Sequence, residues 1–122
     1  MREILFRGKA IDGNWYYGVP LVFTEDYVCI TAPHTYNKTV FPETVGQYTG
    51  LTDKNGKKIF EGDVVRNVSN NNEYVGVVEY SQGAFGMRFA DRSGCFLCIF
   101  SKSFGIIGNI HDNPELGGDT NV

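Results

Sequence analysis

Two cysteines, Cys95 and Cys98, lie three positions apart. This CxxC spacing is the feature of the sequence that most resembles a reactive or metal-binding motif. A zinc site would need a second such pair or a pair of histidines. The chain's other soft ligands are scattered along it, at Cys29, His34 and His111. We therefore expect Cys95 and Cys98 to be small apolar core residues, with zinc or redox chemistry as the alternative, and we expect no metal and no cofactor.

The histidines and a group of carboxylates are the residue types that could act as general acids or bases. No nucleophile that the sequence identifies accompanies His34 or His111. The carboxylates gather around the centre of the chain, at Glu43, Asp53, Glu61 and Asp63. Carboxylates near turns ordinarily accept hydrogen bonds from backbone N–H groups. We therefore expect turn caps, no catalytic residues, and a protein that is not an enzyme.

Three lysines, Lys54, Lys57 and Lys58, form the one visible basic cluster, and Arg66 follows them. A lysine-flanked hairpin with nearby aromatic residues could contact nucleic acid. The net charge of −3 and the pI near 5.3 weigh against a general affinity for phosphates. Nucleic-acid contact through these four residues is therefore the alternative function and not the favoured one.

The turns that present these lysines lie in residues 42–65, PETVGQYTGLTDKNGKKIFEGDVV, which predict three strands joined by two turns. In the first turn Asp53 can cap, Asn55 tolerates unusual dihedrals, and Gly56 accepts a positive φ. Gly62 and Asp63 mark the second turn. We expect Gly56 in the left-handed region at the end of a type I turn.

The remainder of the chain predicts a mainly β fold of antiparallel sheets, barrel-like, with at most one short helix. Fifteen glycines punctuate the 122 residues at short intervals, as short strands require. The chain length suits one domain, which we divide into a β meander at 1–50, a barrel-like lobe at 51–116 and a loose tail at 117–122. The second half has the pattern of a small SH3-like barrel, and residues 69–72 predict a flexible polar loop.

The start of the sequence predicts a strand and not a signal peptide. No apolar run approaches the length of about 18 residues that a membrane span requires. The odd number of cysteines argues against a complete disulfide framework. We therefore expect a cytoplasmic protein that does not contact a membrane.

Residues 42–65 resemble the signature of the YopX family, small proteins of phages and prophages. Weaker matches follow the same order elsewhere: REILFR at 2–7, WYYG at 15–18, IGNI at 107–110 and NPEL at 113–116. The resemblance spans nearly the whole chain and implies one YopX-like domain, a β-rich fold and a phage origin. It implies no activity.

These observations together favour a non-enzymatic phage or prophage accessory protein that acts as a protein-interaction module. Its target, a phage or host protein, is unknown from the sequence. Nine Phe, seven Tyr and one Trp supply the residue types that interfaces favour, and open sheet edges must be covered or paired. We expect a homo-oligomer in the cytoplasm of the infected or lysogenic bacterial host, with SH3-like nucleic-acid binding as the alternative.

Overall fold

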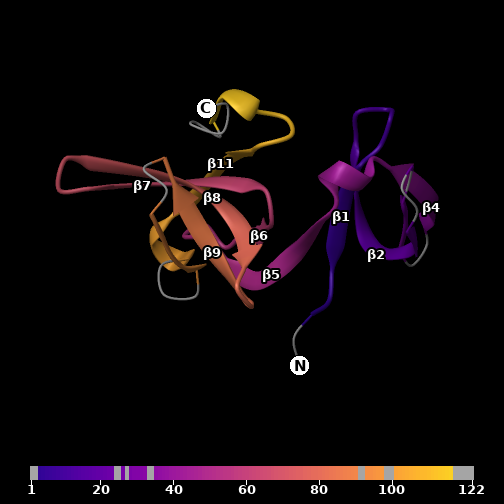
Figure 1. Cartoon of the computed structure of the whole chain (residues 1–122), viewed down its shortest axis with the longest axis horizontal. Helices are drawn as coiled ribbons and strands as arrows, with labels where there is room; N and C mark the ends of the chain where they lie inside the picture. Colours follow the sequence, from indigo (N-terminus) through magenta and orange to yellow (C-terminus); the bar gives the residue numbers. More distant parts are fainter. Residues whose placement is uncertain are drawn as a thin grey trace. The chain divides into compact units, whose positions relative to one another are not determined.

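The computed structural model describes residues 3–23, 26, 28–32, 35–90, 93–97 and 101–116. His34, Cys98 and the expected tail at 117–122 lie outside these residues. The chain divides into two compact units, Met1–Tyr48 and Thr49–Val122 (Figure 1). Both are built from antiparallel strands, so the predicted mainly β class is confirmed. In the described part of the chain, no helix is long and apolar enough to cross a membrane.

The first unit is a curled antiparallel sheet with a small core on one face. Its strands are β1 (Phe6–Lys9), β2 (Trp15–Phe23), β3 (Val28–Ala32), β4 (Thr35–Val40) and the start of β5 (Gly46–Thr52). A 3-10 helix, η1 (Pro42–Thr44), leads into β5. The core consists of Ala10, Val28, Ile30 and Val40. Gly8 is required there, because an added Cβ would lie 2.5 Å from a methyl carbon of Val40.

The second unit contains a five-stranded antiparallel sheet in the order β10-β9-β8-β7-β11. The sheet consists of β7 (Asp63–Ser69), β8 (Asn72–Ser81), β9 (Ala84–Phe89), β10 (Gly94–Phe96) and β11 (Gly105–Asn109). The unit also contains β6 (Lys58–Phe60), which pairs with β5 in the other sheet. The core under one face of the five-stranded sheet is formed by Ile59, Val65, Val78, Met87, Leu97 and Phe104. Short 3-10 turns at η2 (Ser101–Ser103) and at 114–116 flank β11.

The expected SH3-like barrel is wrong, because the sheet is open. Its outermost strands, β10 and β11, each pair with one neighbour and not with each other. The other sheet has the order β4-β3-β2-β1-β5-β6. The end of β4 pairs with the residue after β1 only through one isolated bridge, between Val40 and Ala10. A barrel requires a continuous ladder between its first and last strands, and neither sheet has one among the described residues.

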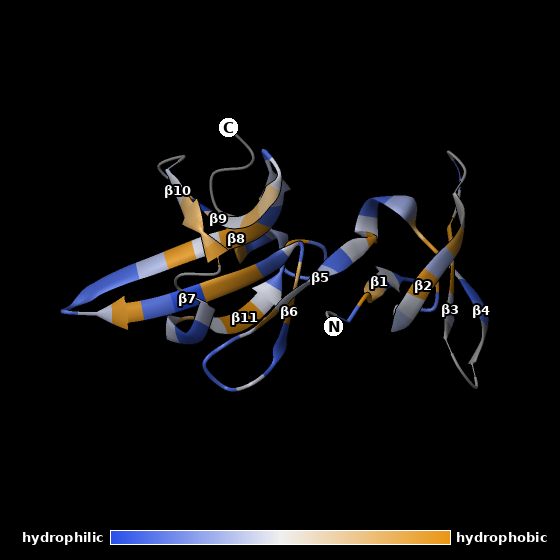
Figure 2. Ribbon diagram, turned by 90° about the horizontal axis from the view of Figure 1, so that it is seen from below, coloured by the Kyte–Doolittle hydropathy of each residue, from blue (hydrophilic) through white to orange (hydrophobic). Residues whose placement is uncertain are grey.

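The hairpin of β7 and β8 projects as a two-stranded arm beyond its neighbouring strands (Figure 1). The predicted loop at 69–72 is in fact a two-residue turn, with φ of 52° at Asn70 and 66° at Asn71. Positive φ at both central residues defines a type I′ turn, which matches the twist of the strands. Figure 2 shows hydrophobic and hydrophilic bands along the arm, which ends in a hydrophilic tip.

Candidate functional site

A groove of about 520 Å³ crosses the outer face of β9 and β10. Its floor is nearly bare backbone, because the facing residues are Gly86 in β9 and Gly94 in β10. The two strands are in close contact here, since a Cβ on Gly86 would lie 2.9 Å from the carbonyl oxygen of Cys95. Side chains at these positions would fill the groove. Glycine on adjacent strands therefore leaves the backbone open to an incoming group.

The walls of the groove combine an ion pair with an exposed aromatic ring. Arg88 donates from Nε to Oε2 of Glu79 at 3.3 Å, across neighbouring strands β9 and β8. Phe96 is 59% exposed. Gln82 belongs to the β8–β9 turn and also lines the groove. This set of groups suits hydrogen bonding and stacking with a flat or extended ligand.

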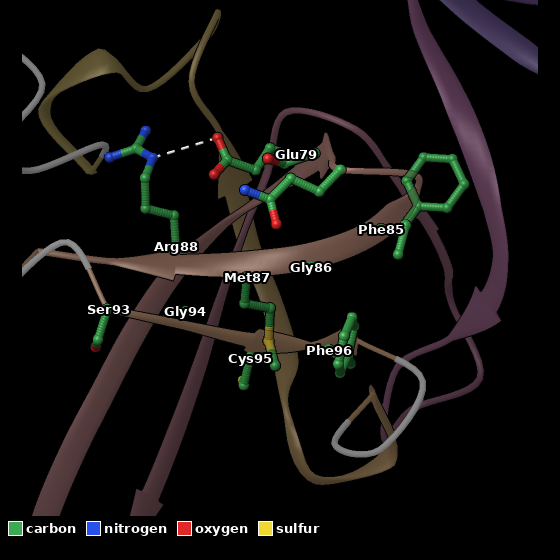
Figure 3. A pocket seen from close by; sticks show the side chains of 12 residues that line it. Glu79, Phe85, Gly86, Met87, Arg88, Ser93, Gly94, Cys95 and Phe96 are labelled. Carbon is green, nitrogen blue, oxygen red and sulfur yellow. Dashed lines mark hydrogen bonds and ion pairs between the residues drawn. The ribbon is translucent and has the colours of Figure 1, made fainter.

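The thiol of Cys95, a residue that lines the groove, does not face it. Cys95 contributes main-chain atoms to it, whereas the Cys95 and Met87 side chains point to the opposite side of the sheet from Arg88 and Glu79 (Figure 3). Burial raises the pKa of the Cys95 thiol, which makes its thiolate scarcer at neutral pH. The geometry therefore supports recognition and offers no thiol–base pair in this groove.

The sequence-predicted turn residues surround a different feature, the buried carboxylate of Asp53, which is 2% exposed. Its Oδ1 accepts the backbone N–H groups of Asn55 at 2.8 Å and Lys57 at 2.9 Å. Its Oδ2 accepts the N–H of Ile106, 53 residues away in the chain, at 2.9 Å. Gly56 has φ +81°. Asp53 thus closes its own turn and ties that turn to β11.

The electrostatics of Asp53 reflect two opposed effects on its pKa. Burial alone would raise the pKa of the carboxyl. The backbone hydrogen bonds from Ile106, Lys57 and Asn55 together outweigh burial and hold the pKa below its ordinary value of 3.8. The side chain of Asp53 is therefore ionised at neutral pH and stabilises the fold by accepting these three hydrogen bonds.

The second turn is built in the same way on a smaller scale. Asp63 is also 2% exposed, and its Oδ2 accepts the N–H of Phe60 at 2.8 Å. Gly62 has φ +90°, and a Cβ there would lie 3.4 Å from Nε2 of His111. His111 donates its backbone N–H to Oδ1 of Asn109 at 3.0 Å. Among the described residues no three His, Cys, Asp or Glu side chains form a metal-binding group.

The structure brings two of the four predicted basic residues together. In the ladder Arg66 lies opposite Gly105, and opposed residues of an antiparallel pair face the same side. A Cβ on Gly105 would lie 3.0 Å from Cε of Lys54, so the lysine stem covers this glycine. Lys57 and Lys58 are exposed on the hairpin. Arg66 also forms an ion pair with Glu73, which offsets its charge.

The groove residues were not predicted from the sequence. The signal that could have revealed the groove is a pair of glycines, Gly86 and Gly94, on the same face of two neighbouring strands. It requires knowing the register, in which Phe96 lies opposite Gly86 and Gly94 opposite Arg88.

The fold is therefore that of a small, mainly β protein of two antiparallel units. The chain belongs to the YopX family: the family described as YopX protein matches residues 6–116. A similar solved structure is protein EF1440 from Enterococcus faecalis, with 26% identity and a TM-score of 0.62. The match covers 96% of this chain and 99% of EF1440. No curated protein sequence is significantly similar to this chain.

Proposed function

We propose that the protein is a non-enzymatic phage or prophage accessory protein that acts through protein contacts, including self-association. Its place of action would be the cytoplasm of the infected or lysogenic bacterial host, as the family resemblance implies. The observation that carries the proposal is an apolar row on the outer face of the first unit. This row consists of Tyr17, Val19 and Leu21 on β2, which are 47%, 46% and 58% exposed.

The apolar row lies on β2, where Tyr17 and Val19 face the same side as alternate residues of a strand. Leu21 lies at the register shift between Pro20 and Val22, and Tyr16 packs on the small core instead. A sheet with one apolar face normally buries that face against a second layer. We propose that a second copy of the chain supplies such a layer. Burial of the exposed half of each of these side chains would stabilise the interface between the two copies by about 1 kcal/mol per residue.

Light scattering after gel filtration tests the self-association. We expect the wild-type protein to be an oligomer and the Val19→Lys variant to be a monomer, because a lysine in the row would have to be desolvated. Val68→Lys is the matched control, since Val68 is an exposed strand valine, 56% exposed, in the other unit. It should leave the mass unchanged. A monomeric wild-type protein at the highest soluble concentration would refute this part of the proposal.

Nucleic-acid binding is the second candidate function, favoured by the position of Lys54 beside Arg66 around Gly105. Two carboxylates, Asp53 and Asp63, lie near these residues in the sequence and would repel a phosphate if they were exposed. Asp53 and Asp63 are buried and accept backbone hydrogen bonds, so neither presents its oxygens to a ligand. The pairing of Arg66 with Glu73 still limits the cluster to few free phosphate contacts.

A further inference from the structure

A second cavity, of about 310 Å³, lies on the core-facing side of the five-stranded sheet. We call it the aromatic cavity; its lining residues are Asn67, Tyr74, Phe89, Cys95 and Phe104. Tyr74 and Phe89 meet edge to face, with ring centroids 6.4 Å apart and planes at 64°. Phe89 and Phe104 are also 6.4 Å apart, at 34°. None of these lining residues, within the part of the chain that the structure describes, is charged.

The walls of the aromatic cavity are held in place by the sheet and the core. The Phe89 ring lies over Gly76, where an added Cβ would be 3.1 Å from its Cε1 atom. Phe104 is 5% exposed and belongs to the core cluster. Tyr74 is 46% exposed and forms the solvent side. The cavity is therefore preformed, as ligand pockets usually are.

The cavity adjoins an open strand edge. β9 ends at Phe89, which lies opposite Gly76, whereas β8 continues to Asn72. Residues 72–75 of β8 therefore pair with β7 and with no other described strand. Tyr74 belongs both to this edge and to the cavity wall. A peptide strand added along residues 72–75 would run past the mouth of the cavity.

We propose that the aromatic cavity receives an aromatic side chain from a partner peptide that pairs, as an added strand, with residues 72–75 of β8. Strand addition supplies main-chain hydrogen bonds, and a pocket beside the edge supplies specificity. Three ring walls favour an aromatic group over an aliphatic one through edge-to-face contacts. The uncharged lining excludes a charged side chain. The Asn67 amide can bond a phenol hydroxyl or an indole N–H.

This inference rests on the proposed function, because it names the chemistry by which the second unit would recognise a protein partner. The probes are blocked amino acids: the N-acetyl amides of tryptophan, tyrosine, leucine and lysine. Each is titrated into the isotope-labelled full chain while backbone amide resonances are followed. We expect saturable shifts at residues 67, 74, 89 and 95 with tryptophan and tyrosine amides. We expect leucine amide to bind at least tenfold more weakly, and we expect no saturable shifts with lysine amide.

Two variants locate the binding. Cys95→Met fills the cavity and should remove the saturable shifts, whereas Cys29→Met, at the half-buried free cysteine of the first unit, should keep them. Tyr74→Ser removes one ring of the cavity wall at a position that is 46% exposed, so the fold should tolerate it. This variant should bind tryptophan amide at least tenfold more weakly than wild type. The proposal is overturned if wild-type protein shows no saturable shifts, if leucine amide binds as well as tryptophan amide, or if both Cys95→Met and Tyr74→Ser bind like wild type.

Failure of this test would leave the proposed function standing. The aromatic cavity belongs to the second unit, whereas the apolar row of Tyr17, Val19 and Leu21 belongs to the first. Light scattering on the wild-type protein reports self-association whether or not the blocked amino acids bind. An oligomer without probe binding would reject the aromatic cavity alone, and a monomer that binds tryptophan amide would reject self-association alone.

Discussion

Removal of the Asp53 carboxylate should strongly destabilise the second unit. Three backbone N–H groups bond to this side chain at 2.8 to 2.9 Å, and it is 2% exposed. A hydrogen bond to a charged group contributes roughly 1.5–3 kcal/mol, and burial of the charge offsets part of the sum. We expect Asp53→Ala to lower the free energy of unfolding by about 3–5 kcal/mol at pH 7.

The conservative variant separates charge from shape. Asp53→Asn keeps the volume but replaces one acceptor oxygen by a donor NH₂ group, which must face an N–H donor. Either the N–H of Ile106 or those of Asn55 and Lys57 lose their acceptor. A loss of about 1–3 kcal/mol follows.

The effect of Asp53 also has a defined pH dependence. A carboxyl whose pKa is lowered by folding contributes stability that is fully present above its unfolded pKa, and this stability is lost as the pH falls through the folded pKa. The difference between wild type and Asp53→Ala should therefore be constant from pH 7 down to about pH 4, near the ordinary value. It should shrink at lower pH.

Denaturant unfolding followed by far-UV circular dichroism at pH 7 and pH 3 measures these differences. Fluorescence of Trp15, the one tryptophan of the chain, reports the first unit separately. Asp12→Ala is the control, because Asp12 also accepts a turn N–H, from Asn14 at 2.9 Å, but is exposed. It should show no measurable change. An Asp53→Ala protein within about 0.5 kcal/mol of wild type at pH 7, the range of ordinary surface substitutions, would refute the reasoning.

Two further predictions concern the same hairpin. Gly56→Val should destabilise by about 1–3 kcal/mol through backbone strain alone, because Gly56 has φ +81° and a Cβ there would meet no atom within 4 Å; a melting curve identical to wild type would contradict this. Fluorescence anisotropy with labelled DNA and RNA should show no binding tighter than about micromolar near physiological salt, since three lysines give a salt slope of about −3 or shallower. Nanomolar binding that is abolished when Lys54, Lys57 and Lys58 become glutamine would favour the second candidate function.

The class of fold could be predicted from the sequence because alternation and turn residues are local signals. The arm shows where this signal fails. Residues 67–74 are exposed or half-buried, so no apolar alternation marks them as strand. Asn70 and Asn71 form the turn, whereas the flanking Ser69 and Asn72 belong to the strands. The end of β7 and the start of β8 were therefore not predicted as strand, because both are polar.

The barrel was predicted wrongly because strand order is not a local property. Six strands from β6 to β11 could close or remain open with the same sequence pattern, and the outcome depends on whether β10 and β11 meet. β10 has three residues and pairs with β9 alone. The contact from Ile106 to Asp53 is equally invisible to a local pattern, because it joins residues 53 positions apart.

The candidate sites depend on register in the same way. Gly86 and Gly94 form a groove floor because their strands are neighbours, and Tyr74 and Phe89 meet because β9 ends beside the arm. The same sheet therefore presents a groove with an ion pair and an exposed ring on one face, and an aromatic cavity on the other. Cys95 lies between them, with its main chain in the groove and its thiol in the cavity. A ligand in the cavity should thus protect the thiol from alkylation, whereas a ligand in the groove should not.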